Sequence, residues 1–240
     1  MEESHHLLKL KRSMLMNGIL PLWKERGMTS HDCVFKLRKI LKTKKVGHTG
    51  TLDPGVEGVL PICIGQATRI AEYLTDAGKT YEAVVAIGRT TTTEDAEGET
   101  VEQDTTNKSF TRTQILQALK TLTGDIQQTP PMFSAVKVNG KKLYEYARAG
   151  QTVERPTRQV TIYELELLSE EENFEGQDVY FSIRIKCSKG TYIRTLAVQI
   201  GEALGYPAHM HELVRTASGT FSKENCLTLA QVAEKVEAQD

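Results

Sequence analysis

The stretch that decides the fold runs from Gly47 to Pro61 and reads GHTGTLDPGVEGVLP. Its four glycines and two prolines argue against a helix, because both residue types interrupt helical backbone. The apolar residues that continue to Ile64 are typical of a buried strand, so we expect a loop that leads into a strand. Asp53 lies at the Asp-Pro turn, where a rigid scaffold could hold a catalytic carboxylate. The alternative is that Asp53 only caps the turn.

This motif resembles the catalytic motif of the TruB-type tRNA pseudouridine synthases. Other blocks of that family follow in the expected order, namely GMTS at residues 27–30, KTY at 79–81 and CSKGTYIRT at 187–195. The resemblance extends from about residue 16 to residue 229. One short motif would be weak evidence, whereas four in order identify the chain as a member of this family.

The resemblance implies the pseudouridine synthase fold. This is an α+β fold with a mixed, mostly antiparallel central sheet flanked by helices. It also implies isomerisation of uridine to pseudouridine at position 55, in the T-loop of tRNA, on a base flipped out of the stack. The partner is then tRNA. Because the sequence lacks metal-ligand spacing and nucleotide-binding motifs, we expect no metal and no organic cofactor, and we also expect no membrane association and a cytoplasmic monomer.

By the same resemblance, Asp53 is the nucleophile and Tyr192 contacts the base and serves in proton removal from C5. Arg194 is expected to pair with Asp53, although its position alone also fits a cation on the surface of a helix. Tyr81 matches the tyrosine that stacks on the target base, and alone it would be read as a core aromatic. A carboxylate can attack C1′ or stabilise positive charge there, and attack at C1′ and deprotonation at C2′ both stay open.

Three further residues are implied in substrate binding. His48 would occupy the space of the flipped nucleotide, and Leu213 would line the uracil pocket. Without the resemblance, they would be a loop hydrogen-bonding group and a core residue. Lys24 stands where the family often has a Lys-Pro pair, but Glu25 replaces the proline, which weakens that assignment.

Composition sets wide bounds on function. At 240 residues with 39% hydrophobic content, the chain can bury a proper core, and it has no apolar run of membrane-spanning length. A net charge of −1 alone argues against nucleic-acid binding, but residues 9–69 hold 12 Lys or Arg against four Asp or Glu. We expect residues 1–15 to be tag-like or disordered and residues 16–240 to form the catalytic domain, without the family's C-terminal PUA domain.

The four cysteines have neither Cys-x-x-Cys nor zinc-ligand spacing, so we expect buried free thiols, which suit the cytoplasm. His48 and Asp53 lie near each other in sequence, but two ligands do not make a metal site.

Apolar periodicity after Thr29 predicts a helix capped by Thr29 and Ser30. Its other face carries cations and no acid, and this basic face could guide phosphates towards Asp53; the alternative is simple solvation. The cations are Lys36, Arg38, Lys39, Lys42, Lys44 and Lys45.

Residues 88–104 are expected to form a mobile loop and residues 170–178 an acidic turn. We expect the tight turn at Asn139 and Gly140 to join a strand to a helix. Further strands are expected at 17–23, 59–64, 80–87, 132–138, 159–168, 179–187 and 209–221, the strand at 159–168 with one phase slip. Further helices are expected at 65–74, 111–122, 141–149, 193–205 and 228–236.

Two other functions compete with the isomerase. A non-catalytic RNA-binding module would not need the set of Asp53, Tyr81, Tyr192 and Arg194. A glycoside hydrolase or nucleosidase would need a second acid, for which Glu57 is the local candidate.

Overall fold

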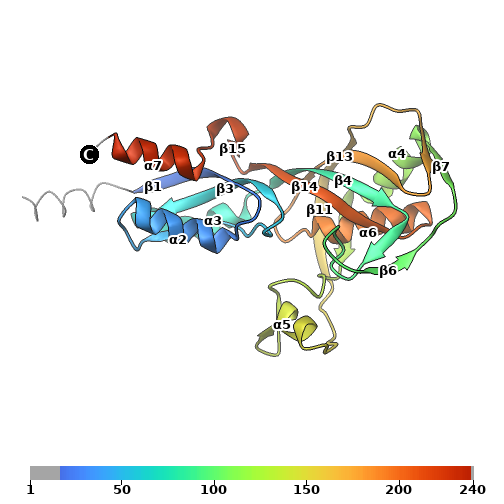
Figure 1. The fold of residues 1–240 in the computed structure, drawn as a ribbon, viewed down its shortest axis with the longest axis horizontal. Helices are drawn as coiled ribbons and strands as arrows, with labels where there is room; N and C mark the ends of the chain where they lie inside the picture. The colour runs from blue at the N-terminus through green and yellow to red at the C-terminus, as the bar shows by residue number, and fades with distance from the viewer. Residues whose placement is uncertain (1–16, 239–240) are drawn as a thin grey trace, which may run out of the picture. The chain divides into compact units, whose positions relative to one another are not determined.

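The structure is a computed structural model that describes residues 17–238, shown as a ribbon in Figure 1. The prediction for residues 1–15 therefore lies outside the described residues. The chain divides into two compact units, each treated by itself. Unit 1 contains residues up to Lys79 and from Val214 onwards, and unit 2 contains Thr80–Leu213.

Unit 1 builds a small sheet around β3. Strands β1 and β2 pair antiparallel with β3, whereas the end of β14 pairs parallel with it through Val214 and Arg215. The elements of unit 1 are β1 (Gly18–Lys24), α2 (Ser30–Ile40), β2 (Val46–His48), β3 (Glu57–Ile64), the 3-10 helix η1 (Gly65–Ile70), α3 (Ala71–Asp76), the end of β14 (Ala208–Ser218), β15 (Phe221–Ser222), η2 (Lys223–Asn225) and α7 (Leu229–Glu237).

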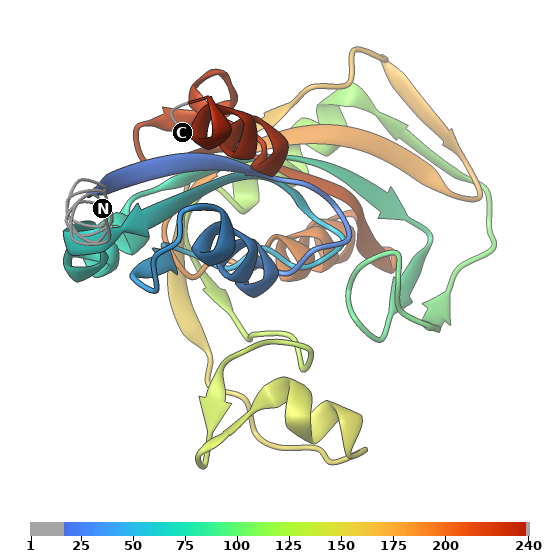
Figure 2. The ribbon, with the colours of Figure 1, turned by 60° about the vertical axis from the view of Figure 1, so that its left-hand side comes forward.

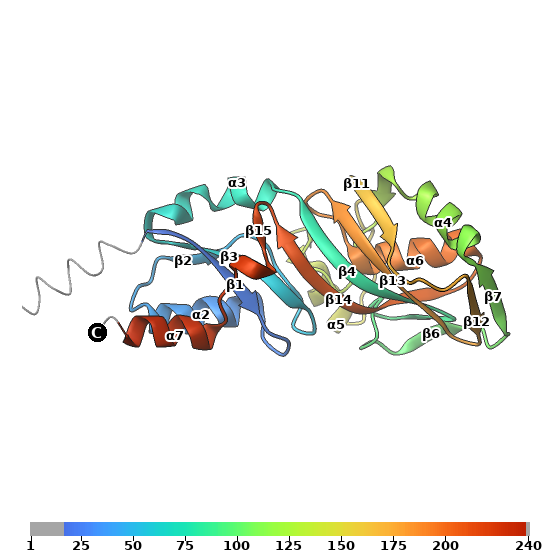
Figure 3. The ribbon, with the colours of Figure 1, turned by 90° about the horizontal axis from the view of Figure 1, so that it is seen from above.

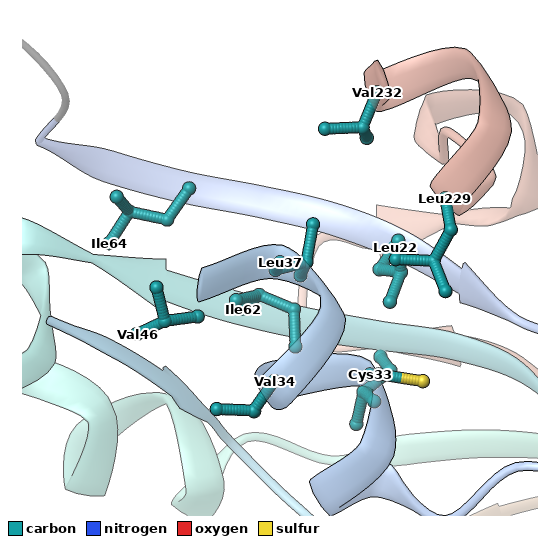
Figure 4. Packing of buried hydrophobic residues seen from close by; sticks show 10 residues of the cluster. Leu22, Cys33, Val34, Leu37, Val46, Ile62, Ile64, Leu229 and Val232 are labelled. Atoms are coloured by element: carbon teal, nitrogen blue, oxygen red, sulfur yellow. The ribbon is translucent and has the colours of Figure 1, made fainter. Parts of the chain in front are cut away.

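The core of unit 1 lies between this sheet and two helices. Figure 4 shows Val34 and Leu37 of α2 meeting Ile62 of β3, while Leu229 and Val232 come from α7. Both helices begin as expected, because Thr29 and Thr228 each form a capping box with the residue three positions later.

The strands of unit 2 follow the order β14-β4-β13-β11-β8. Figure 3 shows α4 and α6 side by side, and Figure 2 shows α5 projecting from the rest of this unit. The elements of unit 2 are β4 (Lys79–Ile87, from Thr80), β5 (Arg89–Thr91), β6 (Thr100–Gln103), β7 (Lys108–Thr111), α4 (Arg112–Thr121), β8 (Gly124–Gln128), β9 (Lys137–Val138), β10 (Lys141–Lys142), α5 (Leu143–Arg148), β11 (Arg158–Leu167), β12 (Asn173–Gly176), β13 (Val179–Cys187), α6 (Ile193–Leu204) and the start of β14.

The predicted fold class is confirmed. Nine strands, counted over residues 17–238, form the main sheet, which is mixed and mostly antiparallel. Alternate residues of β13 are buried as its sequence predicts, and the phase slip in β11 is a register shift between Ile162 and Glu164. The end of α6 at Gly205, with φ at 82°, is also as expected.

Several local predictions are wrong. Residues 88–104 contain the hairpin of β5 and β6. Part of the expected acidic turn is β12, which pairs with β7, and β8 was not predicted. Asn139 and Gly140 join strands β9 and β10, with α5 following. The helix expected at 65–74 is the 3-10 helix η1 followed by α3, and Ile70 at the end of η1 is 45% exposed.

No helix among residues 17–238 is both long and apolar enough to cross a membrane. Cys33, Cys63 and Cys187 are buried free thiols as expected, whereas Cys226 is half-buried.

Candidate active site

The Asp53 loop, residues 49–57, forms the predicted turn at its tip. The Val56 N–H donates to the Asp53 carbonyl at 3.0 Å, which closes the turn around Pro54 and Gly55. The side chain of Asp53 is exposed. An exposed carboxylate on a closed turn can meet a ligand without rearrangement of the backbone.

Arg215 of β14 holds the start of this loop from inside the unit. Its side chain is 1% exposed, and Nε donates to the Val59 carbonyl at 2.8 Å. Two longer contacts of 3.4 Å join Nη1 to the Thr51 oxygen and Nη2 to the Gly50 oxygen. One guanidinium therefore contacts carbonyls on both sides of Asp53, because its five N–H donors point in fixed directions.

Gly58 makes this arrangement possible. The residue lies opposite Arg215 in the parallel pairing of β3 and β14, with φ at 140°. A Cβ at this position would lie 2.3 Å from the Arg215 backbone oxygen. The backbones can approach this closely only because Gly58 has no side chain.

Lys24 supports the turn from β1. Its side chain is fully buried, and Nζ donates to the carbonyl oxygens of Met28 at 2.7 Å, Glu25 at 3.0 Å and Pro54 at 3.4 Å. Burial lowers the pKa of Lys24, while Cys33 and Asp53 oppose that shift. These contacts place Lys24 under the loop; its proposed contact with substrate stays a prediction.

A third support comes from the start of α2. The Leu52 N–H donates to Ser30 Oγ at 2.9 Å, and Ser30 Oγ lies 3.3 Å from the Leu52 carbonyl. The Gly27 N–H donates to the Pro54 carbonyl at 2.8 Å. The loop is thus fixed by residues from β1, α2 and β14, which are far apart in sequence.

His48 makes the loop hydrogen bond that its position suggested. The Gly50 N–H donates to His48 Nδ1 at 3.4 Å. Burial lowers the pKa of His48, with His31 and Arg215 adding to the shift, so the ring is neutral at neutral pH. Its expected role beside a flipped nucleotide stays a prediction.

In unit 2, Arg194 is a buried cation, 7% exposed, so its reading as a surface cation is wrong. It donates from Nη1 to the Thr93 carbonyl at 3.0 Å and from Nη2 to the Phe133 carbonyl at 2.9 Å. Nη1 also lies 3.8 Å from Asp95 Oδ2. Pairing of Arg194 with Asp53 of unit 1 stays a prediction.

The turn that receives Arg194 is tightly bonded. Glu94 has a left-handed φ of 62°, which is unusual for a residue with a side chain. Thr195 Oγ1 donates to Glu94 Oε2 at 2.7 Å, next to the Arg194 contact with Thr93. Burial raises the pKa of Glu94, opposed by this hydrogen bond and by Arg194. Two successive residues of α6 therefore bind one turn.

Tyr192 lies at the predicted corner between β13 and α6, as the N-cap residue of α6. Gln128 of β8 fixes its backbone in both directions, with 2.9 Å from Tyr192 N to Gln128 Oε1 and 3.2 Å from Gln128 Nε2 to the Tyr192 oxygen. Tyr81 is half-buried on β4, and Leu213 is 9% exposed on β14. The expected contacts of these three residues with a base stay predictions.

Sequence reasoning missed the residues that position the site. Arg215, Gln128 and Asp95 are ordinary polar residues in the sequence, and Ser30 was predicted only as a helix cap. Their contacts join segments far apart in the chain. Asp95 lies within residues 88–104, whose polar sequence predicts a mobile loop and no role in the site.

Within residues 17–238, no group of three or more His, Cys, Asp or Glu side chains is arranged to hold a metal ion.

Comparison with known proteins decides the family. Residues 38–193 match the family described as "TruB family pseudouridylate synthase (N terminal domain)". Residues 194–240 match the family described as "tRNA pseudouridylate synthase B C-terminal domain". The chain belongs to the TruB family. It is therefore a pseudouridine synthase, an isomerase, as the motifs predicted.

Curated TruB relatives are similar over most of their length. The tRNA pseudouridine synthase B of Listeria monocytogenes is 66% identical over 225 residues, which cover 94% of this chain and 74% of that protein. The Geobacillus thermodenitrificans enzyme of the same name is 64% identical over 220 residues, with 92% and 73% covered.

Solved structures give the same fold. A crystal structure of a Cbf5-Nop10-Gar1 complex matches with a TM-score of 0.66 and 36% identity, covering 90% of this chain and 54% of that one. An H/ACA RNP bound to a substrate RNA containing 2′-deoxyuridine matches with a TM-score of 0.65 and 32% identity, covering 95% and 55%. The chain thus spans about half the length of these two proteins.

Proposed function

We propose that this chain isomerises uridine to pseudouridine at position 55 in the T-loop of tRNA, on a flipped-out base. Family membership supports the reaction, and relatives that are 61–66% identical bear the name tRNA pseudouridine synthase B. Single-stranded RNA loops suit such an enzyme, because their bases leave the stack at a cost of roughly a few kcal/mol.

The observation that carries this proposal is the exposed carboxylate of Asp53 on a loop held from three sides. Isomerisation breaks the bond between C1′ and N1, turns the uracil and joins C1′ to C5. Asp53 attacks C1′ as N1 leaves, and C5 of the turned uracil then displaces Asp53 from C1′; alternatively, Asp53 takes a proton from C2′ as the same bond breaks and returns it to C2′ as C5 bonds to C1′. In either route the C5 proton is released to solvent after the new bond forms, so no other product appears.

The remaining residues have supporting roles in this proposal. Tyr81 stacks on the base, Leu213 lines the uracil pocket and Tyr192 accepts the C5 proton. Arg194 orients Asp53, because a planar guanidinium can bind a carboxylate in two places. His48 occupies the space that the flipped nucleotide leaves.

Lys24 acts through the loop backbone in our proposal, and its contacts with three carbonyls support this role. The enzyme is expected to be a cytoplasmic monomer that uses neither metal nor cofactor. These expectations stay predictions.

A tritium-release assay tests the function. A tRNA transcript labelled at uridine C5 should lose tritium to solvent in proportion to pseudouridine formed, and mapping should place the modification at position 55. A transcript with cytidine at that position serves as the control. Free uracil would indicate a nucleosidase, and binding without release of tritium would indicate a non-catalytic RNA-binding module.

A further inference from the structure

The exposed face of α2 and the turn after it carry a concentration of positive charge that the proposed chemistry does not use. The sequence has no Asp or Glu between Cys33 and Leu52. Over the same stretch it has six cations, all of them exposed. These six residues, named here the basic face, are Lys36, Arg38, Lys39, Lys42, Lys44 and Lys45.

Packing of α2 leaves the basic face outside. Cys33, Val34 and Leu37 point into the core of unit 1, as Figure 4 shows, so the opposite side of the helix faces away from the sheet. Asp32, the acid in the first turn of α2, is bound to the Thr29 N–H at 2.8 Å and the Thr29 hydroxyl at 2.6 Å. Capping therefore engages the carboxylate on this helix.

The end of the basic face lies on fixed backbone. Lys42 adopts a left-handed φ of 52°, and the Thr43 N–H donates to the Arg38 carbonyl at 3.2 Å. The Gly65 N–H donates to the Lys45 carbonyl at 2.8 Å. From here β2 pairs with β3 and leads directly into the Asp53 loop, all within unit 1.

We propose that the basic face is a second RNA contact, which binds backbone phosphates of the folded RNA next to the target loop. This inference rests on the proposed function, because it requires a polyanionic substrate that reaches Asp53. Lysine ammonium groups are point charges without base preference, so the contact adds affinity and orientation and no sequence selection. The basic face leads directly into the catalytic loop, as a surface for the RNA substrate should. An acidic protein partner would not need that continuity, so RNA is the favoured occupant.

Salt dependence of tRNA binding tests the inference. Each lost phosphate contact should flatten the slope of log K against log salt by about 0.7–0.9, so the variant Lys42→Ala/Lys44→Ala/Lys45→Ala should lose about 2 to 3 from the slope. The matched control is Lys120→Ala/Lys186→Ala/Lys235→Ala, which removes the same charge from three exposed lysines elsewhere. The control should keep the slope of the parent, and the Lys→Arg triple at 42, 44 and 45 should restore it.

Three outcomes decide the matter. An unchanged slope in the first variant, with thermal unfolding like the parent, would show a solvated face and overturn the inference. An equal loss in the control would show a bulk charge effect and overturn it as well. If the parent itself forms no pseudouridine, the proposed function fails, whereas a parent that is active with an indifferent basic face refutes only this inference.

Discussion

Buried cations bind backbone carbonyls both at the Asp53 loop of unit 1 and at the turn of Glu94 and Asp95 in unit 2. The two places differ in whether the nearby acid is exposed or lies against the buried cation. In unit 1, the buried cations Lys24 and Arg215 bind backbone carbonyls while the carboxylate of Asp53 is exposed. In unit 2, Arg194 is the buried group, and carbonyls and acids surround it. In both places one buried cation offers several donors to the carbonyls of irregular backbone and so holds that backbone in place.

The same construction occurs away from the candidate site. Lys108 is fully buried, and Nζ donates to the carbonyls of Gln177 at 2.6 Å, Asp104 at 2.8 Å and Thr106 at 2.9 Å. A buried cation therefore marks a fixed loop and not by itself an active site. What distinguishes the Asp53 loop is the exposed acid that the support holds in place.

The largest effect on stability is expected at Gly58. Gly58→Ala places a Cβ 2.3 Å from backbone oxygen, where no flexible side chain can move away, at a φ that alanine rarely adopts. We expect a loss of about 3 kcal/mol or more of unfolding free energy, measured by urea denaturation. Gly47→Ala is the control, because its Cβ would meet no atom within 4 Å. Equal stabilities of the two variants would show that β3 and β14 are not in close contact.

The next largest effect is expected at Arg215, and a comparison with Lys108 separates a role in positioning Asp53 from a role in stability alone. Arg215→Met and Lys108→Met each remove the buried cation that donates to several loop carbonyls, at a cost of about 1–3 kcal/mol. Only Arg215→Met should also slow isomerisation in single-turnover assays at a temperature where both variants are folded. If both variants keep the parent rate, the carbonyl contacts of Arg215 do not position Asp53.

Substitutions of Arg194 test the role of the buried cation in unit 2. Arg194→Lys keeps the charge but loses the planar contacts with Thr93, Phe133 and Asp95, so its bound-state rate should fall by roughly tenfold or more. Arg194→Met should be slower still. tRNA binding is measured separately for each. Loss of binding with an unchanged bound-state rate would mean that Arg194 holds RNA phosphate instead.

The smallest effect is expected at Glu94, whose pKa is raised above its ordinary value of 4.5 by burial. The fold thus favours the protonated acid, and this stabilisation is present below the unfolded pKa and lost as pH rises through the folded pKa. Glu94→Gln keeps an acceptor for Thr195, so it should gain stability relative to the parent at pH 8, on the order of 2 °C in Tm. The gain should disappear near pH 4, and a gain independent of pH would contradict the burial of this carboxyl.

Sequence could predict the parts that depend on local pattern. Alternation in β13, the cap at Thr29 and the Asp-Pro turn all follow from neighbouring residues. The β5–β6 hairpin could not be predicted, because its polar strands lack the alternation that marks a buried face. Buried cations were missed for a similar reason, since Lys and Arg are usually exposed and only tertiary contacts show otherwise.

The candidate site divides in the same way. Motif resemblance pointed to Asp53, Tyr192 and Arg194, but the groups that hold them, such as Arg215 and Gln128, come from strands distant in sequence. Their partners are backbone atoms, which leave no mark in the sequence.

Single-turnover release of tritium from C5-labelled tRNA by Asp53→Asn tests the central claim most directly. The amide keeps the shape of the carboxylate but loses its charge and nucleophilicity, so release should fall to background while tRNA affinity and unfolding temperature stay at parental values. Release within roughly tenfold of the parent rate would contradict the account, because the supported loop would then present a residue that the chemistry does not need.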